Sequence, residues 1–136
     1  MRRVGKQTYG AITPEKGYSG NDEDQGQMAG VSALMAMGLF SLDGGSSLVP
    51  CYDITSPVFD EITIKLDTDY YSGKVFKVVV HNNSEKNCYI QRAVFNGKEY
   101  ETYQLLHQDL VRGGMLELWM DDIPNKNWGK FSACKK

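Results

Sequence analysis

Alternating apolar and polar residues mark three short segments in the middle of the chain. Residues 62–66 place isoleucine or leucine at every second position, a period that predicts a strand with one buried face. Residues 75–81 are rich in β-branched side chains and predict a second strand, which the polar residues 82–84 terminate. Residues 88–95 predict a third strand.

The next signals along the chain belong to a turn and a return strand. The dipeptide Asn96-Gly97 is favoured in two-residue hairpins, so the chain is expected to return along residues 98–103. We expect a short helical turn near residues 107–111 and a last strand over residues 115–120. Four or five antiparallel strands after one helix indicate an α+β fold, whose second half is a small antiparallel sheet or partial sandwich.

A long apolar run precedes these strands. Residues 25–42 contain no charged side chain, and they predict one long helix over about residues 25–40. The helix is apolar on nearly all sides, which is typical of a helix buried among other helices. A membrane span would need about 20 apolar residues, and Gln25, Gln27 and Ser32 interrupt this run. Because the chain offers few packing partners, we expect an exposed apolar patch or self-association if it stands alone.

Three acids stand directly before this helix. Residues 5–20 are typical of an N-terminal loop, and Asp22, Glu23 and Asp24 follow it. Asp24 is a candidate N-cap, because Gln27 three positions later can return the hydrogen bond in a capping box. Acids at such a position are most often caps or solvated charges. Three adjacent carboxylates repel one another, however, and such a group is suited to hold a water molecule or a metal ion.

The acidic stretch resembles a known family. Residues 17–28, GYSGNDEDQGQM, are similar to the late catalytic loop of glycoside hydrolase family 92, whose members are calcium-dependent, inverting, exo-acting α-mannosidases. The similarity continues in order along nearly the whole chain. It is carried by ITSPVFD (54–60), ITI (62–64), YIQ (89–91), NGK (96–98), HQD (107–109), GGMLE (113–117) and PNKNWG (124–129).

The resemblance implies a domain organisation. Members of the family have an N-terminal β-sandwich and an (α/α)6-toroid of paired helices, and this chain resembles only their last portion. Residues 1–50 would be the end of the helical catalytic domain and would carry the acidic loop. Residues 51–130 would form a C-terminal antiparallel β region, and residues 131–136 a tail.

The resemblance also implies roles for two carboxylates. Matched residue by residue, Asp24 resembles the general base, and Asp22 resembles its partner in holding the attacking water. Asn21 is an extra residue relative to the family pattern, so the match is set on residues 24–27. The general acid, a glutamate, lies upstream of the residues present here. The remainder of the enzyme or a partner chain would have to supply it, and the chain alone is expected to be inactive.

The implied ligands follow from the same resemblance. The substrate would be a mannose-containing glycan with terminal α-linked mannose. Calcium would lie beside the mannose hydroxyls, with Asp24 as a candidate ligand and the other ligands outside this chain. Intact members of the family are expected to be periplasmic or secreted. In this chain no apolar segment follows the basic residues 2–3, so the residues themselves predict no signal peptide.

A second hypothesis belongs to a different class of protein. The β region could be a non-catalytic module that binds carbohydrate or protein, derived from such an enzyme, with its acids no longer in use. Sugar binding without hydrolysis by a soluble, monomeric chain would favour this hypothesis. A glutamate-bearing helical region encoded next to this chain would favour the enzyme.

Net charge and cysteine content argue against nucleic-acid binding and against a zinc or redox site. The 136 residues have a net charge of −2 with acids and bases interspersed, so no basic face for nucleic acid is predicted. The three cysteines fit no zinc or redox motif, and Cys51 and Cys88 are most simply small apolar fillers.

For the histidines and tryptophans, structural roles are favoured over roles in binding or catalysis. His81 and His107 give no metal-ligand spacing and are expected at the surface or at a helix end. Trp119 is expected in the core on its strand. Trp128 is expected to pack the C-terminal tail against the body.

Overall fold

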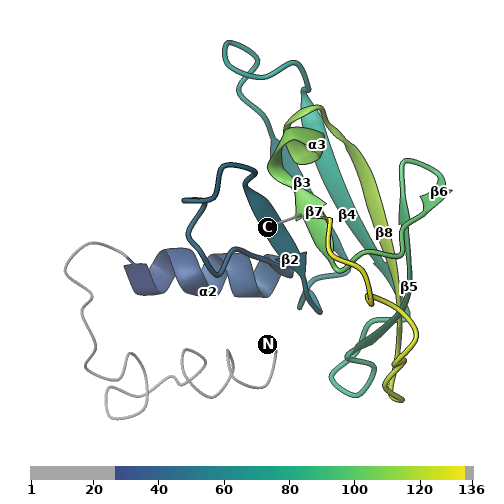
Figure 1. The fold of residues 1–136 in the computed structure, drawn as a ribbon. Coiled ribbons are helices and arrows are strands. Elements are labelled where there is room, and N and C mark those ends of the chain that lie inside the picture. Colours follow the sequence, from purple (N-terminus) through teal and green to yellow (C-terminus); the bar gives the residue numbers. More distant parts are fainter. Residues whose placement is uncertain (1–26, 134–136) are drawn as a thin grey trace.

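The protein is represented by a computed structural model, which describes residues 27–133. In this part of the chain, seven strands separate two helices, and an eighth strand follows the second helix (Figure 1). The elements are α2 (Gln27–Met37), β1 (Leu39–Phe40), β2 (Cys51–Ile54), β3 (Glu61–Lys65), β4 (Val75–His81), β5 (Tyr89–Phe95), β6 (Lys98–Glu99), β7 (Gln104–Leu106), α3 (His107–Val111) and β8 (Gly114–Asp121). The predicted α+β class is confirmed.

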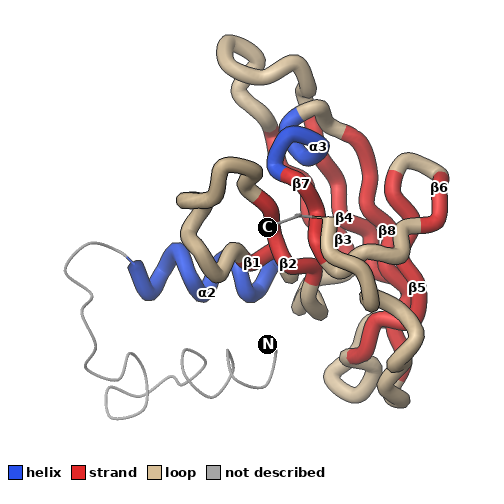
Figure 2. The backbone as a smooth tube through the Cα atoms, viewed as in Figure 1, coloured by secondary structure: helices blue, strands red, loops and turns tan. Residues whose placement is uncertain are grey.

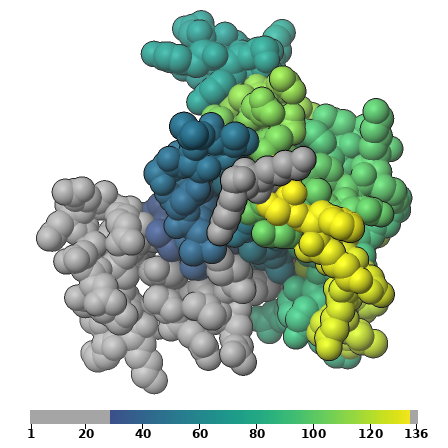
Figure 3. Space-filling view, viewed as in Figure 1, coloured from purple at the N-terminus to yellow at the C-terminus, as the bar shows by residue number. Residues whose placement is uncertain are grey.

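The strands form two sheets in the described part of the chain. The larger has the order β3-β4-β8-β5-β6, and the smaller has the order β1-β2-β7. Figures 1 and 2 show α2 and β2 to one side of the larger sheet. The loop between β3 and β4 projects from the body (Figure 3), and Tyr70 in this loop is 84% exposed.

One hydrophobic core joins the two sheets. Strands β4 and β8 of the larger sheet bury every second side chain, as the period of a strand requires. The core contains Phe76, Val78, Val80, Ala93, Leu116, Leu118 and Met120 from the larger sheet, and Leu39, Ile54, Leu105 and Leu110 from the smaller sheet and α3. The hydrophobic effect therefore holds the two sheets together across this shared layer.

The expected all-antiparallel arrangement is wrong in one place. β4 and β8 are parallel, whereas β8 and β5 are antiparallel. The last strand enters between β4 and β5 instead of adding to an edge. Local patterns predict strands and hairpins, but they carry no information on where a strand from a distant part of the chain inserts.

The return strand after Asn96-Gly97 is also shorter than expected. Only Lys98 and Glu99 pair with β5, and the chain then crosses to the smaller sheet, where it forms β7. The smaller sheet was not predicted. Its strands have two to four residues, too few to display a period.

The apolar helix differs from the expectation in length and in burial. It ends at Met37, and Gly38 follows with φ of +72°. A glycine in the left-handed region is a common helix terminator, so residues 39–40 leave the helix and form β1. The side chains of residues 29–37 are half-buried or exposed, so the expected burial of the helix does not occur within the described chain.

Two further findings bear on the expectations. Cys51 is disulfide-bonded and is therefore not a simple apolar filler, whereas Cys88 has a free thiol. Sequence spacing alone cannot show which thiols approach each other. Within residues 27–133, no helix is long and apolar enough to span a membrane.

Candidate functional site

The two carboxylates expected to carry catalysis, Asp22 and Asp24, lie outside the described residues. The structure does describe α2, which begins at Gln27, three positions after Asp24. The described part of the expected site is therefore the attachment of this helix to the β region.

The C-terminal end of α2 is fixed to the smaller sheet. Leu39, only 2% exposed, pairs with Ile54, so the chain enters a strand directly after the helix. The amide of Thr55 donates to the carbonyl oxygen of Gly38 at 2.7 Å, and the amide of Val58 donates to the carbonyl oxygen of Ala36 at 3.0 Å. Backbone amides of the segment that follows β2 thus hold the end of the helix in place.

The described residues provide no metal centre. In the range 27–133, no group of three or more histidines, cysteines, aspartates and glutamates could hold a metal ion. Calcium, which the resemblance implies, would therefore need ligands from outside this range. The described side chains do not fit a calcium site by themselves.

A row of polar and aromatic side chains crosses the face of the larger sheet opposite the core. His81 on β4 stacks on Trp119 of β8 with ring centroids 4.5 Å apart, and its Nε2 lies 3.0 Å from a carboxylate oxygen of Glu117. On β5, the guanidinium of Arg92 lies 4.6 Å from the centroid of the same indole ring. Trp119 is half-buried in this row, so the expectation that it belongs to the core is wrong.

His107 belongs to a second aromatic cluster. It begins α3, as the sequence suggested, and its Nδ1 lies 3.0 Å from the hydroxyl of Tyr52. Tyr71 approaches the imidazole edge-on, with ring centroids 6.1 Å apart. Burial raises the pKa of Tyr52 above its ordinary value, and the nearby Tyr71 hydroxyl raises it further. The raised pKa means that Tyr52 keeps its proton to a higher pH than an exposed tyrosine does, and its hydroxyl shares a hydrogen bond with the imidazole.

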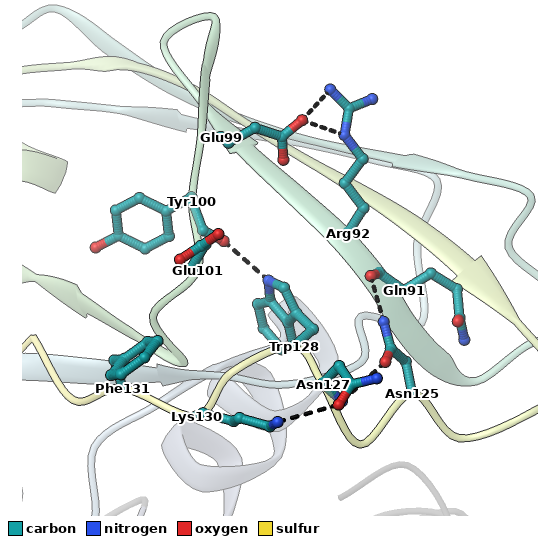
Figure 4. A pocket seen from close by; sticks show the side chains of 10 residues that line it. All are labelled: Gln91, Arg92, Glu99, Tyr100, Glu101, Asn125, Asn127, Trp128, Lys130 and Phe131. Atoms are coloured by element: carbon teal, nitrogen blue, oxygen red, sulfur yellow. Dashed lines mark hydrogen bonds and ion pairs between the residues drawn. The ribbon is translucent and has the colours of Figure 1, made fainter.

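A hollow lies between the β5–β6 hairpin and the C-terminal segment, and we refer to it as the C-terminal hollow (Figure 4). Its volume is about 440 Å³. One wall comes from the hairpin and the residues after it, namely Gln91, Arg92, Glu99, Tyr100 and Glu101. The other wall comes from the C-terminal segment, namely Asn125, Asn127, Trp128, Lys130 and Phe131.

The indole of Trp128 lies in the middle of these residues (Figure 4). Its Nε1 donates to the carbonyl oxygen of Tyr100 at 2.9 Å, and its ring packs against the hydrophobic core. The expectation that Trp128 fastens the C-terminal tail to the body is confirmed. Burial raises the pKa of Tyr100, which lies against the same core.

The comparisons with known proteins concern the chain as a whole. A model of the glycosyl hydrolase family 92 catalytic domain matches residues 1–122. The chain belongs to glycosyl hydrolase family 92.

The relatives that this chain matches are much longer than the chain itself. An uncharacterized secreted glycosidase of Arthroderma benhamiae is 36% identical over 115 residues, which make up 83% of this chain and 14% of that protein. The structure of a family 92 inverting mannosidase from Bacteroides thetaiotaomicron is 36% identical with a TM-score of 0.77, and the match covers 97% of this chain and 17% of that one.

A second solved relative contains a ligand. An α-mannosidase of family 92 from the same bacterium, in complex with mannoimidazole, is 30% identical with a TM-score of 0.78. The match covers 94% of this chain and 16% of that one. This chain therefore corresponds to a small portion of the family 92 relatives that it matches.

Sequence reasoning did not find the C-terminal hollow. Its walls are more than twenty positions apart along the chain, and only the fold brings them together. The one available signal was the segment PNKNWG (124–129), in which two asparagines flank a lysine before a tryptophan. That segment contributed to the family resemblance, but nothing in its pattern predicts a concave surface.

Proposed function

We propose that this chain is the part of an inverting α-mannosidase that supplies the general base for removing terminal α-linked mannose from glycans. Membership of family 92 supports the proposal, and so do the two mannosidases that the chain resembles along almost its whole length. The structural observation that carries it is the anchored helix: α2 follows the acidic stretch immediately, and its far end is fixed to the smaller sheet.

The proposed reaction needs two carboxyl groups. In an inverting glycosidase, one carboxylic acid protonates the leaving oxygen while a carboxylate on the opposite side takes a proton from water, and the two groups stand about 6.5–9.5 Å apart. We assign the second role to Asp24 and the holding of the same water to Asp22. The acid must come from the remainder of the enzyme, so this chain alone does not catalyse hydrolysis.

The described residues have a supporting role in this scheme. A general base must be held close to its proton, and small displacements are costly in rate. Fixing α2 through Gly38 and Thr55 would hold the helix that follows Asp24 against the β region. The apolar sides of α2 that remain uncovered here would be buried by helices of a toroid formed by the remainder of the enzyme.

The proposed partition at residues 50 and 51 separates a helical part from a β region. Strand β1 pairs with β2 across this point, and β2 pairs with β7. We propose that this pairing is the link through which the β region supports the helical part.

Calcium and location complete the proposal. Asp24 is the residue of this chain that we assign to calcium, whose other ligands come from outside residues 27–133; no step above depends on the ion. We propose a secreted or periplasmic location for the intact protein. The Arthroderma relative is described as secreted, and the disulfide at Cys51 is typical of an oxidising compartment.

The decisive experiment replaces the proposed base in the intact enzyme. Asp24→Asn keeps the size of the side chain but removes its basicity, so turnover of an aryl α-mannoside should fall by about 100-fold or more. Glu23→Gln is the matched control, since Glu23 is assigned no role, and it should retain most activity. Thermal unfolding of both variants checks that the fold is intact. Near-wild-type turnover by Asp24→Asn would show that the base lies elsewhere.

A further inference from the structure

The C-terminal hollow has the size of a ligand site and uses none of the residues proposed for catalysis. Its volume of about 440 Å³ falls within the roughly 300–1,000 Å³ typical of small-molecule sites. It is open to solvent, so a ligand attached to a larger molecule could enter from one side.

The two walls of the hollow are fastened to each other. The side-chain amide of Asn125 donates to the carbonyl oxygen of Gln91 at 2.8 Å, and the indole of Trp128 donates to the carbonyl oxygen of Tyr100 at 2.9 Å. Further along, the amide of Tyr103 donates to the carbonyl oxygen of Phe131 at 3.2 Å. These bonds fix the shape of the hollow before any ligand arrives, which lowers the entropic cost of binding.

Charge in the hollow is balanced. Arg92 pairs with Glu99, and their hydrogen bond raises the pKa of Arg92. The positive charge of Arg92 is therefore offset by the carboxylate of Glu99. Lys130 and Glu101 also carry opposite charges. The balance gives no net attraction for a phosphate or another anion, and it favours an uncharged ligand.

Some hydrogen-bonding groups remain available to such a ligand. Lys130 uses one donor on the side-chain oxygen of Asn127 at 3.0 Å, and an ammonium group has three donors. Among residues 27–133, the carboxylate of Glu101 has no partner. An uncharged ligand with several hydroxyl groups could therefore accept from Lys130 and donate to Glu101.

Aromatic surface completes the chemistry. Phe131 is 62% exposed beside the hollow, and the half-buried Trp128 lies between Glu101 and Lys130 (Figure 4). A pyranose ring has polar hydroxyls around its edge and an apolar face of C–H groups. This combination matches an aromatic ring placed between a free carboxylate and an ammonium group.

We propose that the C-terminal hollow binds one neutral pyranose unit of a glycan, with Phe131 or Trp128 against the sugar face and Glu101 and Lys130 on its hydroxyls. This site is additional to the catalytic role and would hold part of a branched or extended substrate. It does not rest on the assignment of Asp24, because binding at the hollow requires neither base nor acid.

The test uses the complete 136-residue chain, labelled with ¹⁵N, and methyl α-D-mannopyranoside as the probe. The chain has two tryptophans, so its NMR spectrum carries one indole signal from the hollow and one from Trp119, which lies outside it and serves as an internal control. We expect saturable shifts of the Trp128 indole signal and of the hairpin amides, with the Trp119 indole signal unchanged. Methyl α-D-glucopyranoside in a second titration shows whether the site distinguishes mannose from another hexose.

Two variants test the assigned contacts. Phe131→Ala removes the exposed ring and Glu101→Gln removes the acceptor charge, and each should weaken binding about fivefold or more. Tyr70→Ala removes an aromatic ring that is 84% exposed on the β3–β4 loop, outside the hollow, and should leave affinity unchanged. The absence of saturable shifts at Trp128, wild-type affinity in both hollow variants, or shifts produced by inorganic phosphate and not by sugar would each overturn the proposal.

Discussion

A backbone hydrogen bond joins Gly38 and Thr55, and the two residues lie too close together for a side chain at position 38. The amide of Thr55 donates to the carbonyl oxygen of Gly38 at 2.7 Å, and a Cβ atom added to Gly38 would lie 2.6 Å from the carbonyl oxygen of Thr55. Gly38 also has φ of +72°, in the left-handed region that other residues adopt at a cost. A residue with a side chain would therefore disturb the junction between α2 and β2 in two ways at once.

The first prediction separates these two effects. Gly38→Ala should lower the free energy of unfolding by about 3 kcal/mol, because the strain of positive φ adds to a clash with fixed backbone atoms. Gly45→Ala is the matched control: Gly45 has φ of +79°, but nothing lies within 4 Å of an added Cβ. It should cost only about 1 kcal/mol. Urea unfolding followed by circular dichroism measures both changes.

Equal losses in the two variants would mean that conformational strain alone requires glycine at position 38. The close approach of Thr55 would then contribute nothing to the anchoring of α2. A larger loss in Gly38→Ala supports the anchoring role on which the proposed function depends.

The second prediction concerns the core shared by the two sheets. Leu118 on β8 is 0% exposed, so Leu118→Ala removes buried apolar contacts and should lower the free energy of unfolding by about 2–5 kcal/mol. Leu48 lies in the loop before β2 and is 102% exposed. Leu48→Ala is the control and should change stability by less than about 0.5 kcal/mol. Similar denaturation midpoints for both variants would contradict the assignment of the core.

Local signals in the sequence predicted the elements that have a clear period or a strong turn. β4 and α3 have the expected bounds, and the hairpin at Asn96-Gly97 forms. The strand order could not be predicted in this way, because the insertion of β8 beside β4 is decided by burial of its apolar face between two neighbours. The end of α2 was missed because Gly38 was treated as part of an apolar run, whereas its positive φ terminates the helix.

The site was predictable only through resemblance. Asp22 and Asp24 were chosen by matching a family motif, and neither is among the described residues, so their roles remain predictions. The C-terminal hollow had no sequence signal of its own. Arg92 and Lys130 reach it from segments whose proximity depends on the hydrogen bonds of Trp128 and Asn125.

The third prediction concerns the turn that joins β5 to β6. Asn96 has φ of +49°, and its side-chain oxygen accepts a hydrogen bond from the amide of Met115 at 2.9 Å. Asn96→Ala removes this bond and places alanine in the left-handed region, so the free energy of unfolding should fall by about 2 kcal/mol. Asn96→Asp keeps a side-chain oxygen and should cost less. Chemical denaturation of the pair measures the difference, and equal costs would show that the bond to Met115 does not tie the hairpin to β8.

The last prediction follows from the raised pKa of Tyr52. Burial is the main cause, and the charge that Tyr71 acquires on ionisation adds to it. Because the folded state holds this proton more tightly than the unfolded state, the contribution to stability is fully present below the ordinary tyrosine pKa of about 10 and is lost as pH rises through the folded pKa.

Stability measured by urea unfolding should therefore fall above about pH 10, and part of this fall should vanish in Tyr52→Phe, which has no proton to lose. Tyr70→Phe is the control, because Tyr70 is 84% exposed on the projecting loop, and it should keep the wild-type slope. Near-ultraviolet absorbance of phenolate gives an independent measure, since Tyr52→Phe should reduce the component that titrates at higher pH, to which Tyr100 also contributes because burial raises its pKa. If Tyr52→Phe leaves both the slope and the titration unchanged, the hydroxyl that faces His107 is not shielded from water as the structure indicates.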